Sequence, residues 1–233
     1  MGVVISKPAI NLREQLTELK AQQGYEERQF HFDGLVTNGT FDTDTSGWTA
    51  YNYQGHAATI SSVAGELTVV NDPTNGGTTA AYQSVPTVVG QTYSVSVDFV
   101  STTTGPPNVL IRNTIGGLTL SSVTTSGAGT YTTTFTATAT STLVILNQNS
   151  TAAGITTKWD NVSVYEVDPN DSNKVIHTMP RGWKPLHVFE DGALQREGSA
   201  YDYTVEYDGF NYVIKETVAP VAPYSTTVIG VRA

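Results

Sequence analysis

The middle of the chain, residues 35–167, alternates apolar and hydroxyl-bearing residues with a period of two. The stretch TYSVSVDFV places four large apolar side chains on one face: Tyr93, Val95, Val97 and Phe99. Successive side chains of a strand point to opposite faces, so this pattern predicts strands with one face in a core. A helix is excluded for such a stretch, because its apolar residues would recur every three to four positions.

Further stretches repeat this pattern, and turn-forming residues separate them. These stretches are GELTVV, NVLIRNT, YTTTFTATA, STLVILNQN and WDNVSVYEV. Short alternating strands between turn clusters are typical of an antiparallel β-sandwich. We therefore predict a sandwich for residues 35–167.

Composition and charge exclude several classes of function. The net charge is −9 and only 14% of residues are charged, without a cluster of Lys and Arg. Phosphate neutralisation needs such a cluster, so we expect no binding to nucleic acid. The chain has no cysteine, which excludes disulfides and thiolate metal sites. No apolar run is long enough to span a membrane, and no Sec-type signal is visible at the N-terminus.

The N-terminal segment, residues 1–34, contains the stretch NLREQLTELKAQQG, which predicts a helix. Asn11 can cap its first turn, and Gly24 can end it. One face of this helix carries three leucines: Leu12, Leu16 and Leu19. The leucines either pack on the chain's own downstream domain or dock an anchoring arm on partner subunits.

The chain changes character after the sandwich. Residues 168–179 are polar and predict a linker, and residues 180–233 are rich in Tyr, Trp, Pro and charge. Two Asp-Gly pairs in this last segment, at Asp191 and Asp208, are hairpin-turn signals. We predict a small C-terminal β domain here, which buries little core of its own.

The sandwich segment resembles a known family of binding domains. The resemblance rests on LVTNGTFDTDTSGWTAYN at its start, GELTVV, VVGQTYSVSVDF and YTTTFTATATSTLVIL, and WDNVSVYEV at its close. These stretches resemble the jelly-roll carbohydrate-binding modules that accompany the catalytic domains of bacterial cellulases and xylanases. The predicted fold class is therefore mainly β, with an N-terminal helical arm, a jelly-roll β-sandwich and a small C-terminal β domain.

The resemblance implies a structural calcium ion where GTFD and DNV lie side by side. By position, its ligands would be Thr40, Asp160 and the backbone of Gly65, with Asp42 close by. Calcium prefers six to eight oxygen ligands, which these groups can help to supply. The alternative is that Asp160 only caps a turn beside Trp159.

The resemblance also implies a sugar site. Tyr51 matches the aromatic residue that follows GW in the family, and Tyr53 lies two residues on. The polar residues near strand ends are candidate partners for sugar hydroxyls: Arg112, Asn113, Asn147, Gln148 and Asn149. The alternative is that both tyrosines serve packing or face solvent.

A second resemblance concerns the two flanks. MPRGWKPLHVFEDGALQREGSAYDYTVEYDGF is similar to short domains in structural proteins of tailed bacteriophages, and ISKPAINLREQLTELKA is similar to arms of virion proteins. This implies a virion protein assembled in the bacterial host cytoplasm, most simply a capsid decoration or head-fibre subunit. Its arm would anchor it to other capsid or tail proteins. We also expect a symmetric homo-oligomer, such as a trimer, whose jelly rolls contact host-surface glycans.

Three alternatives to this function differ in class. The first is a tail fibre or tail accessory protein for host adsorption, and the second is a stand-alone carbohydrate-binding module. The third is an enzyme, in which Asp42, Asp44 or Asp160 would hydrolyse glycosides. We expect no catalysis, because these carboxylates belong to the calcium region or to turns, and the four histidines have no metal-ligand spacing.

Overall fold

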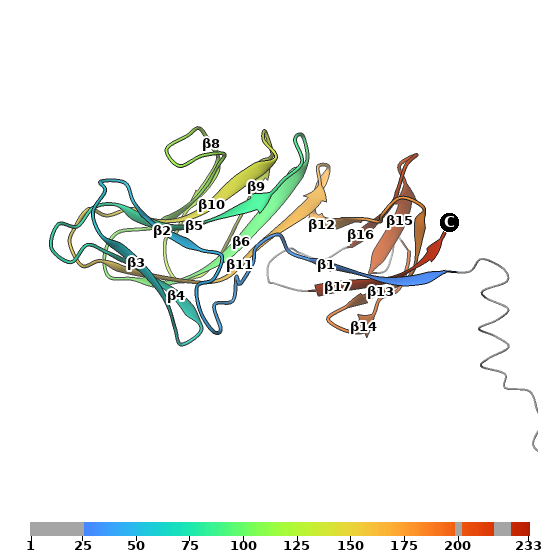
Figure 1. The fold of residues 1–233 in the computed structure, drawn as a ribbon, viewed down its shortest axis with the longest axis horizontal. Coiled ribbons are helices and arrows are strands. Elements are labelled where there is room, and N and C mark those ends of the chain that lie inside the picture. Colours follow the sequence, from blue (N-terminus) through green and yellow to red (C-terminus); the bar gives the residue numbers. More distant parts are fainter. Residues whose placement is uncertain (1–25, 199–201, 217–224) are drawn as a thin grey trace, which may run out of the picture.

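Every element of secondary structure in the described residues is a β-strand. The computed structural model describes residues 26–198, 202–216 and 225–233 (Figure 1). The strands are β1 (Glu27–Asp33), β2 (Thr49–Asn52), β3 (Ala58–Val63), β4 (Glu66–Asn71), β5 (Thr79–Pro86), β6 (Thr92–Thr102), β7 (Asn108–Arg112), β8 (Thr119–Thr124), β9 (Gly129–Thr136), β10 (Ser141–Gln148), β11 (Thr156–Asp168), β12 (Asp171–Thr178), β13 (Trp183–Glu190), β14 (Ala193–Leu194), β15 (Tyr203–Tyr207), β16 (Tyr212–Glu216) and β17 (Ser225–Arg232).

The predicted fold class is wrong in its N-terminal helical arm. The described residues contain no helix, and so none that could cross a membrane. Residues 27–33, the end of the segment predicted as an arm, form β1. Their sequence ERQFHFD alternates in the strand pattern, with Phe30 and Phe32 packed against the C-terminal core. The predicted helix with its leucines Leu12, Leu16 and Leu19 lies outside the described residues.

Two antiparallel sheets form the predicted sandwich. We call β2-β5-β10-β7-β8 the front sheet and β3-β4-β11-β6-β9 the back sheet. The long strand β11 extends beyond the sandwich and pairs with β12, so that the back sheet continues into β16 and β15. Figure 1 shows β11 running from the sandwich towards these strands.

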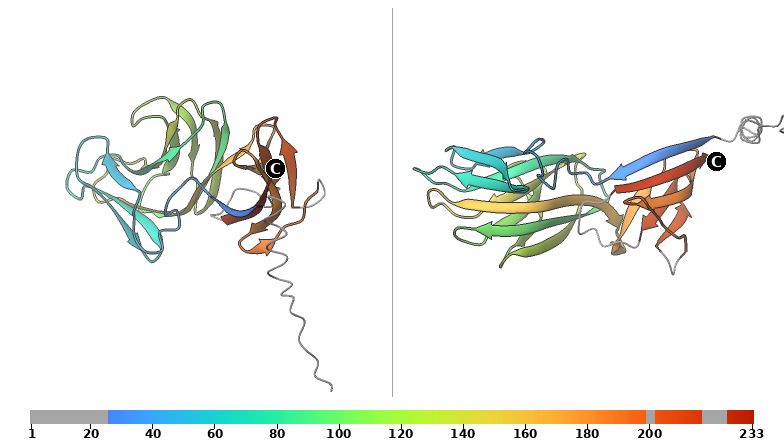
Figure 2. Two further views of the ribbon diagram at one scale, coloured as in Figure 1. Left: turned by 45° about the vertical axis from the view of Figure 1, so that its right-hand side comes forward. Right: turned by 90° about the horizontal axis from the view of Figure 1, so that it is seen from below.

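The C-terminal unit consists of β1 and β12 to β17. Its second sheet has the order β1-β17-β13-β14, in which β1 pairs with β17 in antiparallel register, Phe30 opposite Val228. Figure 2 shows these two strands, blue and red, side by side. The sandwich is thus inserted between β1 and β12, and residues 171–178 of the predicted linker form β12. The division of the chain into a sandwich domain, a linker and a separate C-terminal domain stays a prediction.

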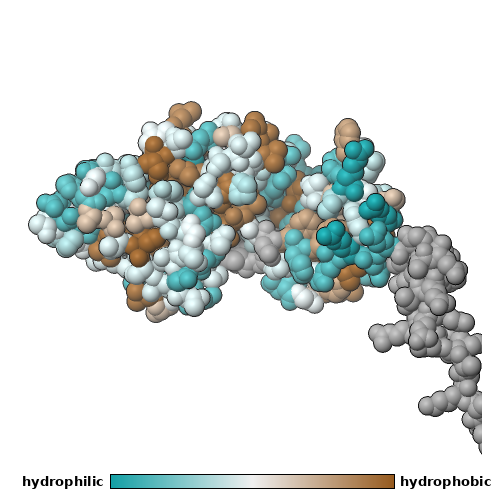
Figure 3. Space-filling view, viewed as in Figure 1, coloured by the Kyte–Doolittle hydropathy of each residue, from teal (hydrophilic) through white to brown (hydrophobic). Residues whose placement is uncertain are grey.

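The surface of the sandwich differs from that of the C-terminal unit. In Figure 3 strongly hydrophilic residues gather on the C-terminal unit, whereas the sandwich is mostly pale with scattered apolar patches. The pale colour reflects its many Ser and Thr residues, which carry no charge. Charged groups on the sandwich are therefore few enough to be considered one by one.

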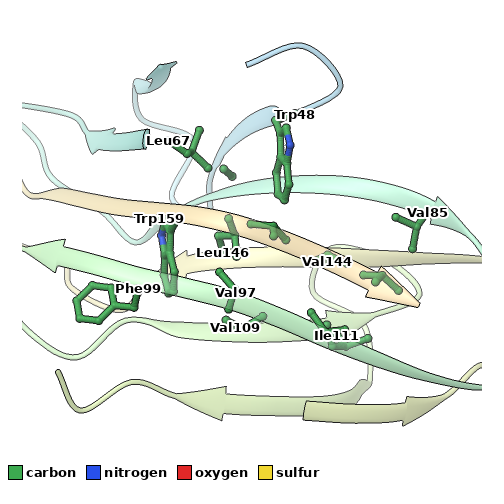
Figure 4. Close-up of a cluster of buried hydrophobic side chains, with 14 of the residues drawn as sticks. Trp48, Leu67, Val85, Val97, Phe99, Val109, Ile111, Val144, Leu146 and Trp159 are labelled. Atoms are coloured by element: carbon green, nitrogen blue, oxygen red, sulfur yellow. The ribbon is translucent and has the colours of Figure 1, made fainter. Parts of the chain in front are cut away.

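The main core lies between the front and back sheets (Figure 4). The apolar face predicted for β6 is confirmed, since Tyr93, Val95, Val97 and Phe99 are all buried there. Trp159 of β11 is fully buried, and its ring lies 5.4 Å from that of Phe99. The C-terminal unit has a smaller core of its own, which Phe30 closes through an edge contact with Trp183 at 5.1 Å.

Candidate functional site

The opening motif NGTFD…GW belongs to the core of the sandwich. Phe41 and Trp48 are buried with their rings 5.4 Å apart, and the Trp48 indole N–H donates to the carbonyl of Asn38 at 3.2 Å. The backbone at Gly39 lies so close to β11 that an added Cβ would stand 2.0 Å from the carbonyl oxygen of Val162. The motif therefore builds the fold, and a sugar site must be sought elsewhere.

Three tyrosines gather on the outer face of the front sheet. Tyr51 lies beside Tyr53 and Tyr82, with ring centroids 5.0 and 6.5 Å away and nearly perpendicular planes. We call Tyr51, Tyr53 and Tyr82 the tyrosine cluster. It comes from β2 and β5 and the residue after β2, because the register places Tyr51 opposite Ala80 and Thr49 opposite Tyr82. All three rings are partly exposed.

A pocket of about 380 Å³ lies next to the tyrosine cluster. We call it the amide pocket, since amide side chains form half of its lining: Tyr53, Gln54, Thr78, Asn108, Leu110, Arg112, Asn147 and Asn149. Neighbouring strands β7 and β10 supply its floor, where the Asn147 side chain donates to the Asn108 side-chain oxygen at 2.7 Å. A cavity with a few convergent polar groups is the usual form of a small-ligand site.

Two buried polar atoms of residues lining the amide pocket have no hydrogen-bond partner among the residues that the structure describes. These are the hydroxyl of Tyr53 and the side-chain oxygen of Asn147, a residue that is only 4% exposed. Burial raises the pKa of Tyr53, and the positive charge of Arg112 opposes this shift. The pocket thus offers a donor, an acceptor and a cation within one space.

Loop contacts fix the rim of the amide pocket. The Asn52 side chain donates to the carbonyl of Gly76 at 3.3 Å, and its oxygen accepts the backbone N–H of Gln54 at 2.9 Å. A Cβ on Gly77 would lie 2.9 Å from that Asn52 amide, and its φ of +98° also favours glycine. The close approach of these two loops positions Gln54 and Thr78 at the rim of the pocket.

The structure brings together most of the residues predicted for sugar binding. Tyr53, Arg112, Asn147 and Asn149 line the amide pocket, and Tyr51 lies in the adjoining tyrosine cluster. The other two predicted residues, Gln148 and Asn113, lie elsewhere. Sugar binding by this set stays a prediction.

Gln148 and Asn113 are engaged away from the pocket. Gln148 is 1% exposed, because it follows Asn147 and so points to the opposite face, where it accepts from Thr79 at 2.6 Å. Asn113 lies beyond the end of β7, and its amide donates to Thr138 at 2.8 Å.

Sequence reasoning missed other residues of this surface, above all Tyr82, Asn108 and Gln54. The signal for Tyr82 was present, because it alternates with the core residues Ala81 and Val85 along β5. The signal for Asn108 was weaker, since its value to the site depends on pairing with Asn147 across two strands.

Thr40, Asp42 and Gly65, from the group predicted to bind or surround calcium, lie close together in the loop before β2 and the turn before β4. The Thr40 hydroxyl donates to Asp42 at 2.7 Å, and a Cβ on Gly65 would lie 3.8 Å from the other Asp42 oxygen. Burial raises the pKa of Asp160, and the negative charges of Asp98, Asp42 and Glu66 add to this shift. Oxygen donors with excess negative charge fit calcium chemically.

Two contacts limit the ligand set. One Asp160 oxygen accepts the Asn161 backbone N–H at 2.7 Å, and Lys158 pairs with Glu66 at 2.7 Å. Across residues 26–198, 202–216 and 225–233, no three His, Asp or Glu side chains gather as a metal site. Calcium binding therefore stays a prediction, as does the expectation that the chain is not an enzyme.

Comparisons with known proteins give the following. No protein-family model matches the chain, and no curated protein matches it. Solved structures similar to it include a carbohydrate-binding module, CBM4, at 20% identity and a TM-score of 0.46, covering 56% of this chain and 99% of that chain. Another is the N-terminal cellulose-binding domain of β-1,4-glucanase C from Cellulomonas fimi, at 22% identity and a TM-score of 0.43, covering 57% and 97%.

A phage protein is also among the similar structures. The enzymatically active domain of tailspike protein 4 from bacteriophage CBA120 has 16% identity and a TM-score of 0.42, with 57% of this chain and 21% of that chain covered. At these identities and TM-scores the likenesses carry no functional argument. The resemblance to virion proteins stays a prediction, and the site rests on the geometry of this chain.

Proposed function

We propose that the protein binds a glycan on the outer face of the front sheet. The observation that carries this proposal is the tyrosine cluster directly beside the amide pocket. Aromatic faces stack on the apolar face of a pyranose ring, while amides and Arg112 hydrogen-bond its hydroxyls. The unpartnered Tyr53 hydroxyl and Asn147 oxygen would each gain a hydrogen bond from such a ligand.

The arrangement of the site favours an oligosaccharide over a monosaccharide as the ligand. Tyr51 and Tyr82 lie outside the amide pocket, which Tyr53 shares with the strands β7 and β10. One ring in the pocket and one on the tyrosines would occupy both surfaces. Contacts of this kind are weak singly, and a symmetric oligomer would multiply them.

The experiment is a glycan-array and polysaccharide pull-down screen with the wild-type protein and Tyr51→Ala. We expect Tyr51→Ala to lower affinity about tenfold or more, the loss of one stacked ring. Tyr207→Ala is the matched control, because Tyr207 is 60% exposed on the C-terminal unit, away from the front sheet. No binding by the wild-type protein, or equal binding by both variants, would contradict the proposal.

The finer assignment is that this glycan contact serves a tailed-bacteriophage virion, as a decoration, head-fibre or tail component. Support comes from the resemblance of the stretch after residue 179 and from the insertion of the sandwich between β1 and β12. A sandwich inserted into a small β unit would suit a domain that projects from the virion surface while the small unit is attached to it. Mass spectrometry of purified particles tests this, and particles that lack the protein would contradict it.

A further inference from the structure

Charge is unevenly distributed between the two sheets of the sandwich. The five strands of the front sheet contain no Asp or Glu, and their only charged residue is Arg112. The strands of the back sheet carry most of the acidic residues of the sandwich: Glu66, Asp98, Asp160, Glu166 and Asp168. An anion can therefore approach the strands of the front sheet with less repulsion than those of the back sheet.

Arg112 has no acidic partner in the part of the chain that the structure describes. Its Nε donates to the Thr119 hydroxyl at 3.0 Å, and the lining of the amide pocket contains no carboxylate. The other basic residue of the sandwich, Lys158, is paired with Glu66. The terminal N–H groups of Arg112 are therefore left for a ligand.

The loop before β5 contains an acidic residue, Asp72, whose carboxylate is engaged within that loop. This carboxylate accepts the backbone N–H groups of Thr74 and Asn75 at 2.7 and 2.8 Å. These donors hold the pKa of Asp72 down to about 2, so its charge is already compensated by its own loop.

We infer, on the basis of the proposed function, that the glycan is acidic and that a sugar carboxylate binds the guanidinium of Arg112. The planar guanidinium matches a carboxylate with two parallel hydrogen bonds, which makes such pairs stronger than neutral contacts. The Tyr53 hydroxyl can donate to the same sugar, and the Asn147 oxygen can accept from a ring hydroxyl. A uronic acid residue supplies all three partners.

The net charge of −9 does not oppose this assignment. Screening removes most interactions between exposed charges beyond about 8–10 Å at physiological salt. Among the described residues, no Asp or Glu lines the amide pocket. The local contact at Arg112 therefore decides which glycans bind.

The test is calorimetry on the full chain with uronate oligosaccharides, each beside its own methyl ester. Esterification removes the carboxylate charge and leaves the rest of the sugar chain unchanged. We expect the free acid to bind about tenfold to a hundredfold more tightly, the range of a charge-assisted hydrogen bond. Arg112→Gln should abolish the preference for the acid, so that the acid and its ester bind equally to this variant.

Two further variants make the result specific. Arg112→Lys should keep part of the preference, because it retains the charge and loses the paired geometry. Lys174→Gln is the control, since it removes a cation from β12 in the C-terminal unit. Equal binding of acid and ester, or binding of sulfated glycans alone, would overturn the inference.

The design separates this inference from the proposed function. Neutral glycans that bind through Tyr51, with no gain from a carboxylate, would leave the proposed function standing and overturn the acidic ligand. A protein that binds neither neutral nor acidic glycans would overturn both.

Discussion

The front and back sheets of the sandwich share one core and differ on their outer faces. Both send their aliphatic and aromatic residues inward, as Val144 of β10 and Val97 of β6 do. Outside, the front sheet carries tyrosines and a second apolar group around Ala80, Leu110 and Ile145. The same alternating pattern therefore forms two sheets whose outer faces differ in chemistry.

The outer face of the back sheet carries hydroxyls and carboxylates instead. Thr132, Thr134 and Thr136 of β9 are exposed, and Asp98 and Asp160 stand on β6 and β11. Partly exposed aromatic side chains often mark interaction sites, whereas a face of Thr and Asp is ordinary surface. The two sheets are therefore distinguished by their outward positions more than by their core positions.

The largest expected effect separates the core from the binding face. Trp159→Ala should destabilise the protein by about 3–5 kcal/mol, because Trp159 is fully buried between the sheets. Tyr51→Ala should cost about 1 kcal/mol or less, since Tyr51 is partly exposed. Urea unfolding of both variants measures the two values. If Tyr51→Ala destabilises the protein as strongly as Trp159→Ala, the distinction between core and outer face would be contradicted.

The acidic corner of the back sheet gives an effect of intermediate size. Because burial and the charges of Asp98, Asp42 and Glu66 raise the pKa of Asp160, its ionised form is disfavoured in the folded state. Without metal, Asp160→Asn should therefore have a higher melting temperature than the wild type at neutral pH. As the pH falls towards 3.8, the folded wild type takes up the proton first and gains stability, so the difference should shrink.

Calcium should reverse the order of the melting temperatures of the wild type and Asp160→Asn. With millimolar calcium in place of a chelator, we expect the melting temperature of the wild type to rise and that of Asp160→Asn to stay constant. Asp171→Asn serves as the control, because it removes a carboxylate from the C-terminal unit. A wild-type melting temperature that does not change with calcium would indicate that Asp160 only caps a turn.

The smallest expected effect concerns the loop that joins the two sheets. Backbone N–H groups of Asn75 and Thr74 lower the pKa of Asp72 to about 2, so its ionised form stabilises the fold. Asp72→Asn should be slightly less stable than the wild type above about pH 5, and the difference should vanish between about pH 4 and about pH 2. Thermal melts across this range measure it. A difference that persists in acid would assign the effect to shape instead of charge.

Several features of the fold were predictable because they are local. The inward face of β6 follows from its alternation, and so do the inward positions of Phe135 on β9 and Ala137 just after it. The outward face of β6 was less predictable, since Ser94 and Ser96 are buried as well. In the register with β11, Ser94 lies opposite Tyr165 and Ser96 opposite Ser163, both of which are buried too.

The candidate site was predictable only in part. Tyr51 and Tyr53 follow a recognisable motif, whereas Asn108 and Asn147 form a site only because β7 and β10 pair in one particular register. Asn113 and Gln148 have the same chemistry and lie outside it. Residue type alone cannot distinguish the two groups, because a shift of one position along a strand moves a side chain to the other face.

The strands of the sandwich and their inward faces follow from the sequence alone, because alternation acts between neighbouring residues. The place of β1 in the C-terminal unit depends on tertiary structure, since His31 contacts Thr227 at a separation of 196 residues. The same holds for Arg112, which has no carboxylate beside it among the described residues that line the amide pocket. Such pairings depend on which distant strands meet, and the free energy that selects them comes from burial shared across the whole core.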